Sequence, residues 1–256
     1  MIYKFAERSN YEDFAAGHVI YHRPGFTNYP VRLASEIFMR AYTHCGKKKV
    51  TLYDPCCGGG YLLTVLGFLH GDKINAIYGS DISKEAVSLT IQNMQLLSPE
   101  ALLSRSYGIF EKEVSAQRLL PLCQSIKFEI FERDILSQGG NSPADIDIVI
   151  TDVPYGDMTS WELDATAKTF TLTEGRCDRV GSVLTNRQGN MFPPLRMDAE
   201  SNADIGLMLK NLNAKIIAVS SNKKQKLAIK DESYRRLEKF KVGKRKIEIL
   251  RKNCQQ

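Results

Sequence analysis

The sequence predicts an α/β fold, in which a mixed, mostly parallel sheet is flanked by helices and carries an antiparallel strand at one edge. Short β-branched and aromatic runs alternate with stretches whose apolar residues recur about every 3.6 positions, as in strands that alternate with helices. Three consecutive glycines, from Gly58 to Gly60, follow the first such run and predict a tight turn into a helix. Near the end of the chain, two apolar runs flank Gly243, which indicates an antiparallel strand pair.

No repeat or linker divides the sequence, and 256 residues fit one domain, so we expect a single domain over residues 1–256. Residues 1–45 are expected to be an N-terminal helical extension and residues 163–200, which lack a period, an irregular insertion. The predicted elements, in chain order, are a helix over 29–42 capped by Asn28, a strand over 50–53, a helix over 61–69, a strand over 76–81, a helix capped by Ser83, a helical stretch from Ser98 to about 124, strands over 127–131 and 146–151, a helix capped by Ser201, a strand over 216–219, and the closing pair around 240–242 and 247–250.

The composition is that of a soluble globular protein, with 43% hydrophobic and 25% charged residues. No apolar run reaches the roughly 20 residues of a membrane span, and the first residues lack the apolar segment of a signal peptide. The six cysteines include no C-x-x-C pair, which favours a reducing compartment and argues against a metal site. We therefore expect a cytoplasmic monomer, and its net charge of +6 mildly favours a polyanionic partner.

The glycine turn predicts a ligand site. In the stretch Asp54–Gly60, an acid ends the predicted strand and the glycines begin the next helix, whose free N–H groups can bind a polar or anionic ligand. A dinucleotide-binding turn would need a third glycine where Leu63 stands. The pattern D-x-x-x-G-x-G instead resembles motif I of the methyltransferases that use S-adenosyl-L-methionine (SAM). This resemblance implies a cofactor site made by Asp54, Cys56, Gly58 and Gly60, whereas the alternative is a plain structural turn.

Four acids fall at the ends of four successive predicted strands: Asp54, Asp81, Asp134 and Asp152. Because the carboxyl ends of parallel strands share one edge of a sheet, we expect these side chains along one rim. Asp81 lies about twenty residues beyond the glycines, the separation at which nucleotide-binding folds place a ribose-binding carboxylate. Asp134 resembles the superfamily acid that receives the adenine amino group, and helix capping is its alternative role. The cofactor contacts expected along this rim are Asp81, Ile82, Asp134, Ile135 and Asp152.

The stretch Asp152–Gly156 carries the most specific chemistry. It resembles the D/N-P-P-Y/F motif of methyltransferases that act on base amino groups, with Val153 where the first proline usually stands. A carboxylate and a backbone carbonyl that accept hydrogens from the target nitrogen stabilise the positive charge that develops on it. We expect Asp152 and the carbonyl near Pro154 to act in this way, while Tyr155 stacks on the extruded base. A plain strand-end turn is the alternative.

A cysteine nucleophile is disfavoured. The RNA cytosine-C5 methyltransferases that use one carry Pro-Cys in the fourth-strand motif, where this chain has Pro154-Tyr155. Here Pro55-Cys56 lies in the glycine turn, so we expect these small side chains to pack against the cofactor.

The tail between Lys223 and Lys246 is rich in Lys and Arg. Together with the arginines of residues 163–200 it could form a phosphate-binding rim, or it could be an ordinary solvated face. Trp161 could stack on a base or fix the neighbouring loop, and the sequence does not decide between these roles.

Five stretches carry a closer resemblance: His18–His22, Tyr29–Phe38, Asp54–Thr64, Asp152–Gly156 with Thr159 and Trp161-Glu162, and Leu237–Gly243. In these the chain resembles the avilamycin-resistance rRNA methyltransferase (AviRa) family. The resemblance implies a Rossmann-like class I methyltransferase fold and SAM-dependent methylation of a guanine in large-subunit, 23S-type ribosomal RNA. It further implies that His22 and Arg32 belong to the site region, and it suggests a link to antibiotic resistance. The candidate substrate contacts are therefore His22, Arg32, Tyr155 from the fourth-strand motif, and Trp161 if it stacks on a base.

Two other functions stay open on the sequence alone. The fourth-strand motif also suits a methyltransferase that acts on an adenine amino group of DNA or RNA. A protein that keeps the fold and binds nucleic acid without catalysis would show the same basic tail. A comparison of methyl transfer to rRNA fragments and to duplex DNA tests the first alternative. A protein that binds RNA but not SAM would support the second.

Overall fold

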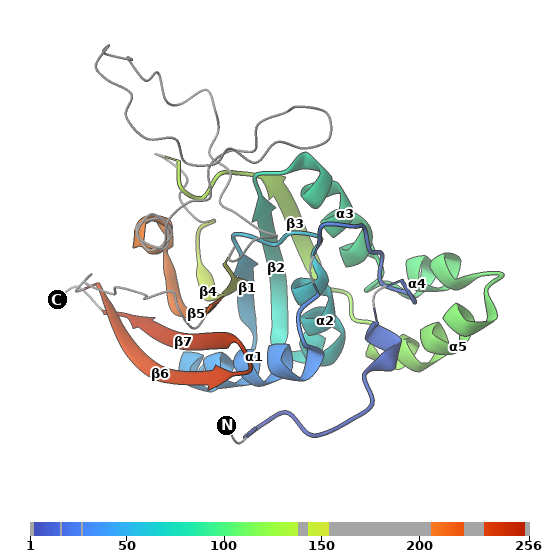
Figure 1. The fold of residues 1–256 in the computed structure, drawn as a ribbon, viewed down its shortest axis with the longest axis horizontal. Helices are drawn as coiled ribbons and strands as arrows, with labels where there is room; N and C mark the ends of the chain where they lie inside the picture. Colours follow the sequence, from blue (N-terminus) through green and yellow to red (C-terminus); the bar gives the residue numbers. More distant parts are fainter. Residues whose placement is uncertain are drawn as a thin grey trace, which may run out of the picture.

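A computed structural model of the chain describes residues 3–15, 17–26, 28–137, 143–153, 206–222 and 233–253. At its centre lies a seven-stranded sheet in the order β3-β2-β1-β4-β5-β7-β6 (Figure 1). The strands are β1 (Val50–Asp54), β2 (Ile74–Asp81), β3 (Lys127–Glu132), β4 (Ile146–Asp152), β5 (Ala214–Asn222), β6 (Tyr234–Val242) and β7 (Arg245–Lys252). The order reverses between β1 and β4, and ligands of open α/β sheets bind at such a reversal.

The pairing of the strands confirms the predicted mixed sheet. β1 runs parallel to β2 and β4, and β4 runs parallel to β5. β7 lies between β5 and β6 and is antiparallel to both, so the hairpin predicted around Gly243 forms one edge. β4 is buried along its length up to Thr151, which explains why most of its residues are apolar.

Helices cover both faces of the sheet. They are α1 (Val31–Cys45), α2 (Tyr61–His70), α3 (Lys84–Gln95), α4 (Pro99–Ser106) and α5 (Phe110–Leu119), with the short 3-10 helices η1 (Glu12–Phe14), η2 (Gly71–Lys73) and η3 (Leu120–Leu122). α1 and α2 pack on one face, where Phe38 and Leu63 join the larger hydrophobic core. The helical residues 206–211 pack on the other face, where Leu209 joins a second core. Within the described ranges, no helix is long and apolar enough to cross a membrane.

The beginnings of the helices test the predicted caps. Ser83 caps α3 as predicted, because its Oγ accepts a hydrogen bond from the Ala86 N–H at 3.3 Å. The prediction that Asn28 caps the first helix is wrong. Pro30 occupies the cap position with an extended backbone (ψ 117°), and its carbonyl accepts the first helical bond, from the Ala34 N–H at 2.9 Å.

The helical stretch predicted from Ser98 to about 124 begins correctly but is divided. The Ser98 Oγ accepts a hydrogen bond from the Ala101 N–H at 3.2 Å and so caps α4. The chain then turns at Gly108, whose φ of +78° is left-handed, and α5 follows as a separate helix. The remaining predicted cap, Ser201, lies outside the described residues.

A buried carboxylate fixes the N-terminal segment to α1. The Glu36 side chain is fully buried and accepts hydrogen bonds from the backbone N–H groups of Lys4, Phe5 and Ala6 at 2.8 to 2.9 Å. The Arg40 Nε donates to the same carboxylate at 2.7 Å. Burial alone would raise the pKa of Glu36, but these four donors hold it below its usual value.

Candidate active site

The glycine turn joins β1 to α2 and adopts a backbone that favours glycine. Gly58 and Gly60 have φ values of +53° and +75°, in the left-handed region. Space at the turn is also limited, because a Cβ on Gly60 would lie 2.7 Å from the Thr90 Cγ2 and 2.9 Å from its Cα. The turn therefore excludes side chains both by conformation and by contact with α3.

Two polar side chains of α3 hold the carbonyl groups of the turn. The Thr90 Oγ1 donates to the Gly58 carbonyl at 2.7 Å, and the Asn93 Nδ2 donates to the Gly59 carbonyl at 2.8 Å. Asn93 is fully buried and also bonds the backbone N–H and carbonyl of Tyr21, at 2.8 and 3.1 Å. It thus joins the glycine turn to the N-terminal segment 17–26. Sequence reasoning missed Asn93, although a polar residue on the apolar face of a predicted helix was an available signal.

The segment 17–26 lies over the glycine turn. Phe26 of this segment lies beside the turn, because a Cβ built on Gly59 would be 3.6 Å from the Phe26 Cβ. His22 belongs to the same segment and is exposed. Arg32 is held elsewhere: its Nε donates to the Ala6 carbonyl at 3.1 Å and its guanidinium lies 3.9 Å from the centre of the Tyr3 ring.

Asp81 connects the end of β2 to the glycine turn. Its Oδ2 accepts a hydrogen bond from the Gly58 N–H at 2.9 Å, and its Oδ1 accepts one from the Ser83 N–H at 3.0 Å. An ionised carboxylate has about four acceptor sites, so one carboxylate can bond both backbone N–H groups and ligand hydroxyls. The neighbouring Ile82 is half-buried.

Asp54 is the buried member of the acid rim. It is 2% exposed, and its Oδ1 accepts a hydrogen bond from the Cys56 N–H at 3.0 Å. Burial, together with the negative charges of Asp81 and Asp152, raises the pKa of Asp54 to about 7. The structure thus brings three of the four predicted acids close enough to interact.

Asp134 follows β3 in a turn without a helix. Its Oδ1 accepts a hydrogen bond from the Leu136 N–H at 2.8 Å, which stabilises the turn. The preceding Arg133 N–H donates to the Asp81 carbonyl at 2.9 Å, so this segment runs beside the end of β2. Ile135 is buried in the second core.

Asp152 ends β4 and faces a cation. The Arg245 Nη2 lies 3.5 Å from the Asp152 Oδ2, and the same guanidinium lies 4.8 Å from the centre of the Tyr29 ring. The next residue, Val153, is 1% exposed and packs in the second core. At the position where the D/N-P-P-Y/F motif has its first proline, this chain therefore has a core side chain. Pro154, Tyr155 and Trp161 lie outside the described residues.

The two cysteines of the turn are poor nucleophiles. Burial raises the pKa of the Cys56 and Cys57 thiols well above the usual value, and the nearby charges of Asp54 and Asp81 add to this effect. Both groups therefore stay protonated, which agrees with the argument against a thiolate mechanism.

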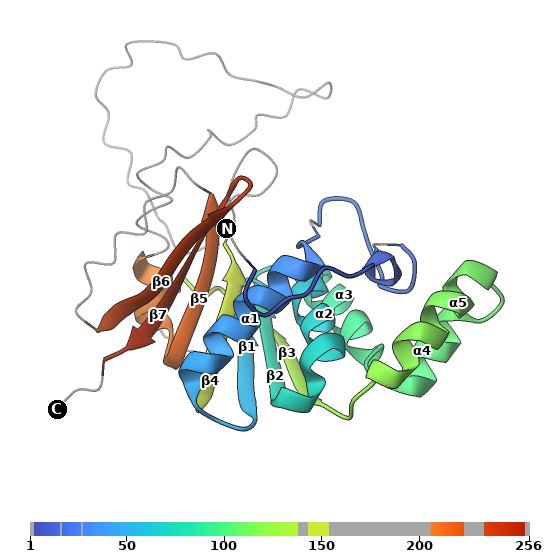
Figure 2. The same ribbon diagram turned by 90° about the horizontal axis from the view of Figure 1, so that it is seen from below.

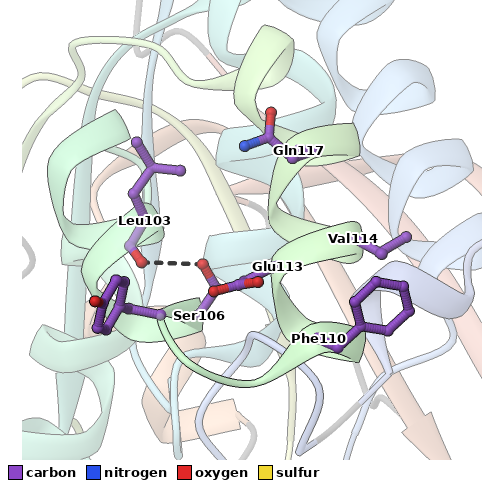
Figure 3. A pocket seen from close by; sticks show the side chains of 7 residues that line it. Leu103, Ser106, Phe110, Glu113, Val114 and Gln117 are labelled. Atoms are coloured by element: carbon purple, nitrogen blue, oxygen red, sulfur yellow. Dashed lines mark hydrogen bonds between the residues drawn. The ribbon is translucent and has the colours of Figure 1, made fainter.

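A hollow between α4 and α5 is lined by Leu103, Ser106, Tyr107, Phe110, Glu113, Val114 and Gln117 (Figure 3). These two helices carry none of the predicted site residues, and they lie at the opposite end of the molecule from the β6–β7 hairpin (Figure 1). Among the described residues, no cluster of His, Cys, Asp and Glu could hold a metal ion.

Comparison with known proteins agrees with this arrangement. The family described as rRNA methyltransferase AviRa matches residues 1–174. The 23S rRNA (guanine(2535)-N(1))-methyltransferase of Streptomyces viridochromogenes is 38% identical over 181 residues, which are 61% of this chain and 71% of the relative. Two structures of rRNA methyltransferase aviRa from the same organism, at 1.5 and 2.4 Å, each match with a TM-score of 0.71 and 28% identity, over 98% of this chain and 96% of theirs.

Proposed function

The chain belongs to the AviRa family of rRNA methyltransferases, and we propose that it transfers a methyl group from SAM to N1 of a guanine in large-subunit ribosomal RNA. The observation that carries this proposal is the meeting of the glycine turn, Asp81 and Asp152 at one end of the sheet. The target base and atom are those named for the Streptomyces relative.

The residues at the turn fit SAM. The left-handed backbone of Gly58 and Gly60 shapes the turn that would hold the methionine part, and the Asp81 carboxylate beside it would accept hydrogen bonds from the ribose hydroxyls. The turn that begins at Asp134, beside the end of β2, would border the adenine, and the Ile135 side chain in the second core supports this turn. When bound, SAM supplies a strongly electrophilic methyl group, because this group is attached to a positively charged sulfur.

Asp152 acts on the guanine. N1 of guanine is a ring nitrogen that carries a hydrogen, so the nitrogen must lose this proton as it gains the methyl group. A carboxylate beside N1 can accept the proton as a general base. As the proton leaves, negative charge grows on the base, and the guanidinium of Arg245, 3.5 Å from Asp152, stabilises it. Tyr155 and the Pro154 carbonyl would hold the plane of the base.

Replacement of Asp152 tests this role. We expect Asp152→Asn to lower the methyl-transfer rate about 10²- to 10⁴-fold, as the loss of a general base does, with little change in SAM affinity. Transfer of tritiated methyl from SAM to large-subunit rRNA measures the rate, and calorimetry measures SAM binding. Glu111→Gln, which changes an exposed carboxylate of α5, is the matched control.

The same assay includes duplex DNA and RNA that contains adenine but no guanine. Label in either substrate, or wild-type rates in Asp152→Asn, would contradict the proposal.

A further inference from the structure

The β6–β7 hairpin accounts for the positive charge of the whole chain. Between Tyr234 and Lys252 it contains nine Lys and Arg residues against two Glu, a formal charge of +7. The whole chain carries +6, so the remaining residues together carry −1. The charge is therefore concentrated on one element at the edge of the sheet.

The strand register sets like charges against each other within this hairpin. Lys241 is paired with Lys246, and Arg235 is paired with Arg251. Directly opposed like charges destabilise an antiparallel pair. The hairpin thus keeps a repulsion that a bound polyanion would relieve.

The two glutamates do not neutralise the hairpin. Glu248 is 1% exposed and lies 2.6 Å from the Arg236 Nε, 3.3 Å from the Lys246 Nζ and 4.0 Å from the Lys239 Nζ, so one acid serves three cations. Burial, together with the charges of Lys239 and Arg236, outweighs the attraction of Glu248 and lowers the pKa of Lys246. The other acid, Glu238, is occupied by two side chains of α1, at 2.6 Å from the Arg40 Nη1 and 2.7 Å from the His44 Nε2.

The hairpin is also continuous with the candidate active site. β6 is the edge strand, and the turn into β7 ends at Arg245, the residue beside Asp152 (Figure 2). Arg235, Lys239, Lys241 and Lys244 are exposed along this edge. A polyanion lying along β6 would therefore lead towards the acid rim.

We propose that the β6–β7 hairpin is the surface that binds the sugar-phosphate backbone of the RNA substrate and directs the target base to Asp152. The proposal rests on the proposed function for its choice of RNA. An anionic membrane surface is less suitable, because membrane-surface elements insert large apolar side chains and none of those exposed in the described residues lies on the hairpin. Phosphate groups need only the charge that the hairpin presents.

Two triple variants test the proposal. Arg235→Gln, Lys241→Gln and Lys244→Gln together remove three exposed charges from the hairpin. The control variant combines Lys48→Gln, Lys49→Gln and Lys127→Gln. It removes three exposed charges at the amino-terminal ends of β1 and β3, away from the acid rim. None of the six residues belongs to the candidate active site. Binding of a large-subunit rRNA transcript is measured for each variant over a range of salt concentrations, together with SAM binding and the kinetics of methyl transfer.

For the hairpin variant we expect an RNA affinity lower by tenfold or more at low salt. The slope of log Kd against log salt concentration should be smaller by about 2, because fewer phosphate contacts release counterions. KM for RNA should rise while kcat at saturating RNA and SAM affinity stay near wild type. RNA binding like wild type, or an equal loss in the control, would overturn the proposal. Aggregation with unchanged RNA affinity would also overturn it and assign the lysines to protection of an edge strand. Failure of the proposed function is a separate result, because wild-type protein would then bind RNA without methylating it.

Discussion

At the scale of single residues, the acids of the rim differ in what surrounds them. The Asp81 carboxylate accepts two backbone N–H groups, one of them from the glycine turn. Asp152 faces the guanidinium of Arg245, and Asp54 is buried with a pKa raised to about 7. These surroundings fit the roles proposed for Asp81 at the ribose and for Asp152 at the proton, and Asp54 supports the turn through its bond to the Cys56 N–H.

The ribose role of Asp81 gives a prediction. Asp81→Asn keeps the shape of the side chain but loses the charge that strengthens hydrogen bonds from hydroxyl donors. We expect SAM affinity to fall about 10- to 100-fold, the equivalent of one or two charge-assisted bonds. Calorimetry with SAM measures the change, and Asp72→Asn, a mainly exposed acid of η2, is the control. Unchanged affinity in Asp81→Asn would remove Asp81 from the ribose site.

At the scale of elements, the sequence predicts the bounds of strands better than it predicts contacts between distant residues. β1, β2, β4 and β5 begin and end within three residues of their predicted bounds, because buried parallel strands have apolar runs of limited length. The sequence could not reveal that Asn93 bonds Tyr21, 72 residues away, or that Arg32 packs on Tyr3. Such partners depend on the tertiary fold and leave no periodic signal.

The attachment of the N-terminal segment gives a stability prediction. Glu36→Gln removes the charge that receives three backbone N–H groups and Arg40, so we expect the free energy of unfolding to fall by about 3 kcal/mol at pH 7. Because the pKa of Glu36 is below its usual 4.5 in the folded state, its contribution is present above about pH 4.5 and is lost as the pH falls further.

Urea unfolding at several pH values measures this difference, with the exposed Glu129→Gln as control. A variant as stable as wild type at pH 7, or a difference that grows as the pH falls, would contradict the role of Glu36.

At the scale of the whole molecule, the sheet order explains why residues distant in sequence form one site. β1 and β2 bring the glycine turn and Asp81 together, and β4 places Asp152 beside them. β7 adds Arg245, a charged neighbour of this rim that the motifs did not predict. The mixed α/β fold and the acid rim were predictable from strand-end patterns, whereas the position of the hairpin depended on a pairing between β5 and β7 that the sequence does not show.

The central claim is that the glycine turn and the Asp152 corner together methylate a guanine. Mass spectrometry of large-subunit rRNA after reaction with purified protein and SAM tests it most directly. The account predicts one new methyl group, on N1 of a single guanine, and a far smaller methylated fraction after the same reaction time with Asp152→Asn. Methylation of another base, or rRNA left unmodified by the wild-type protein, would contradict it.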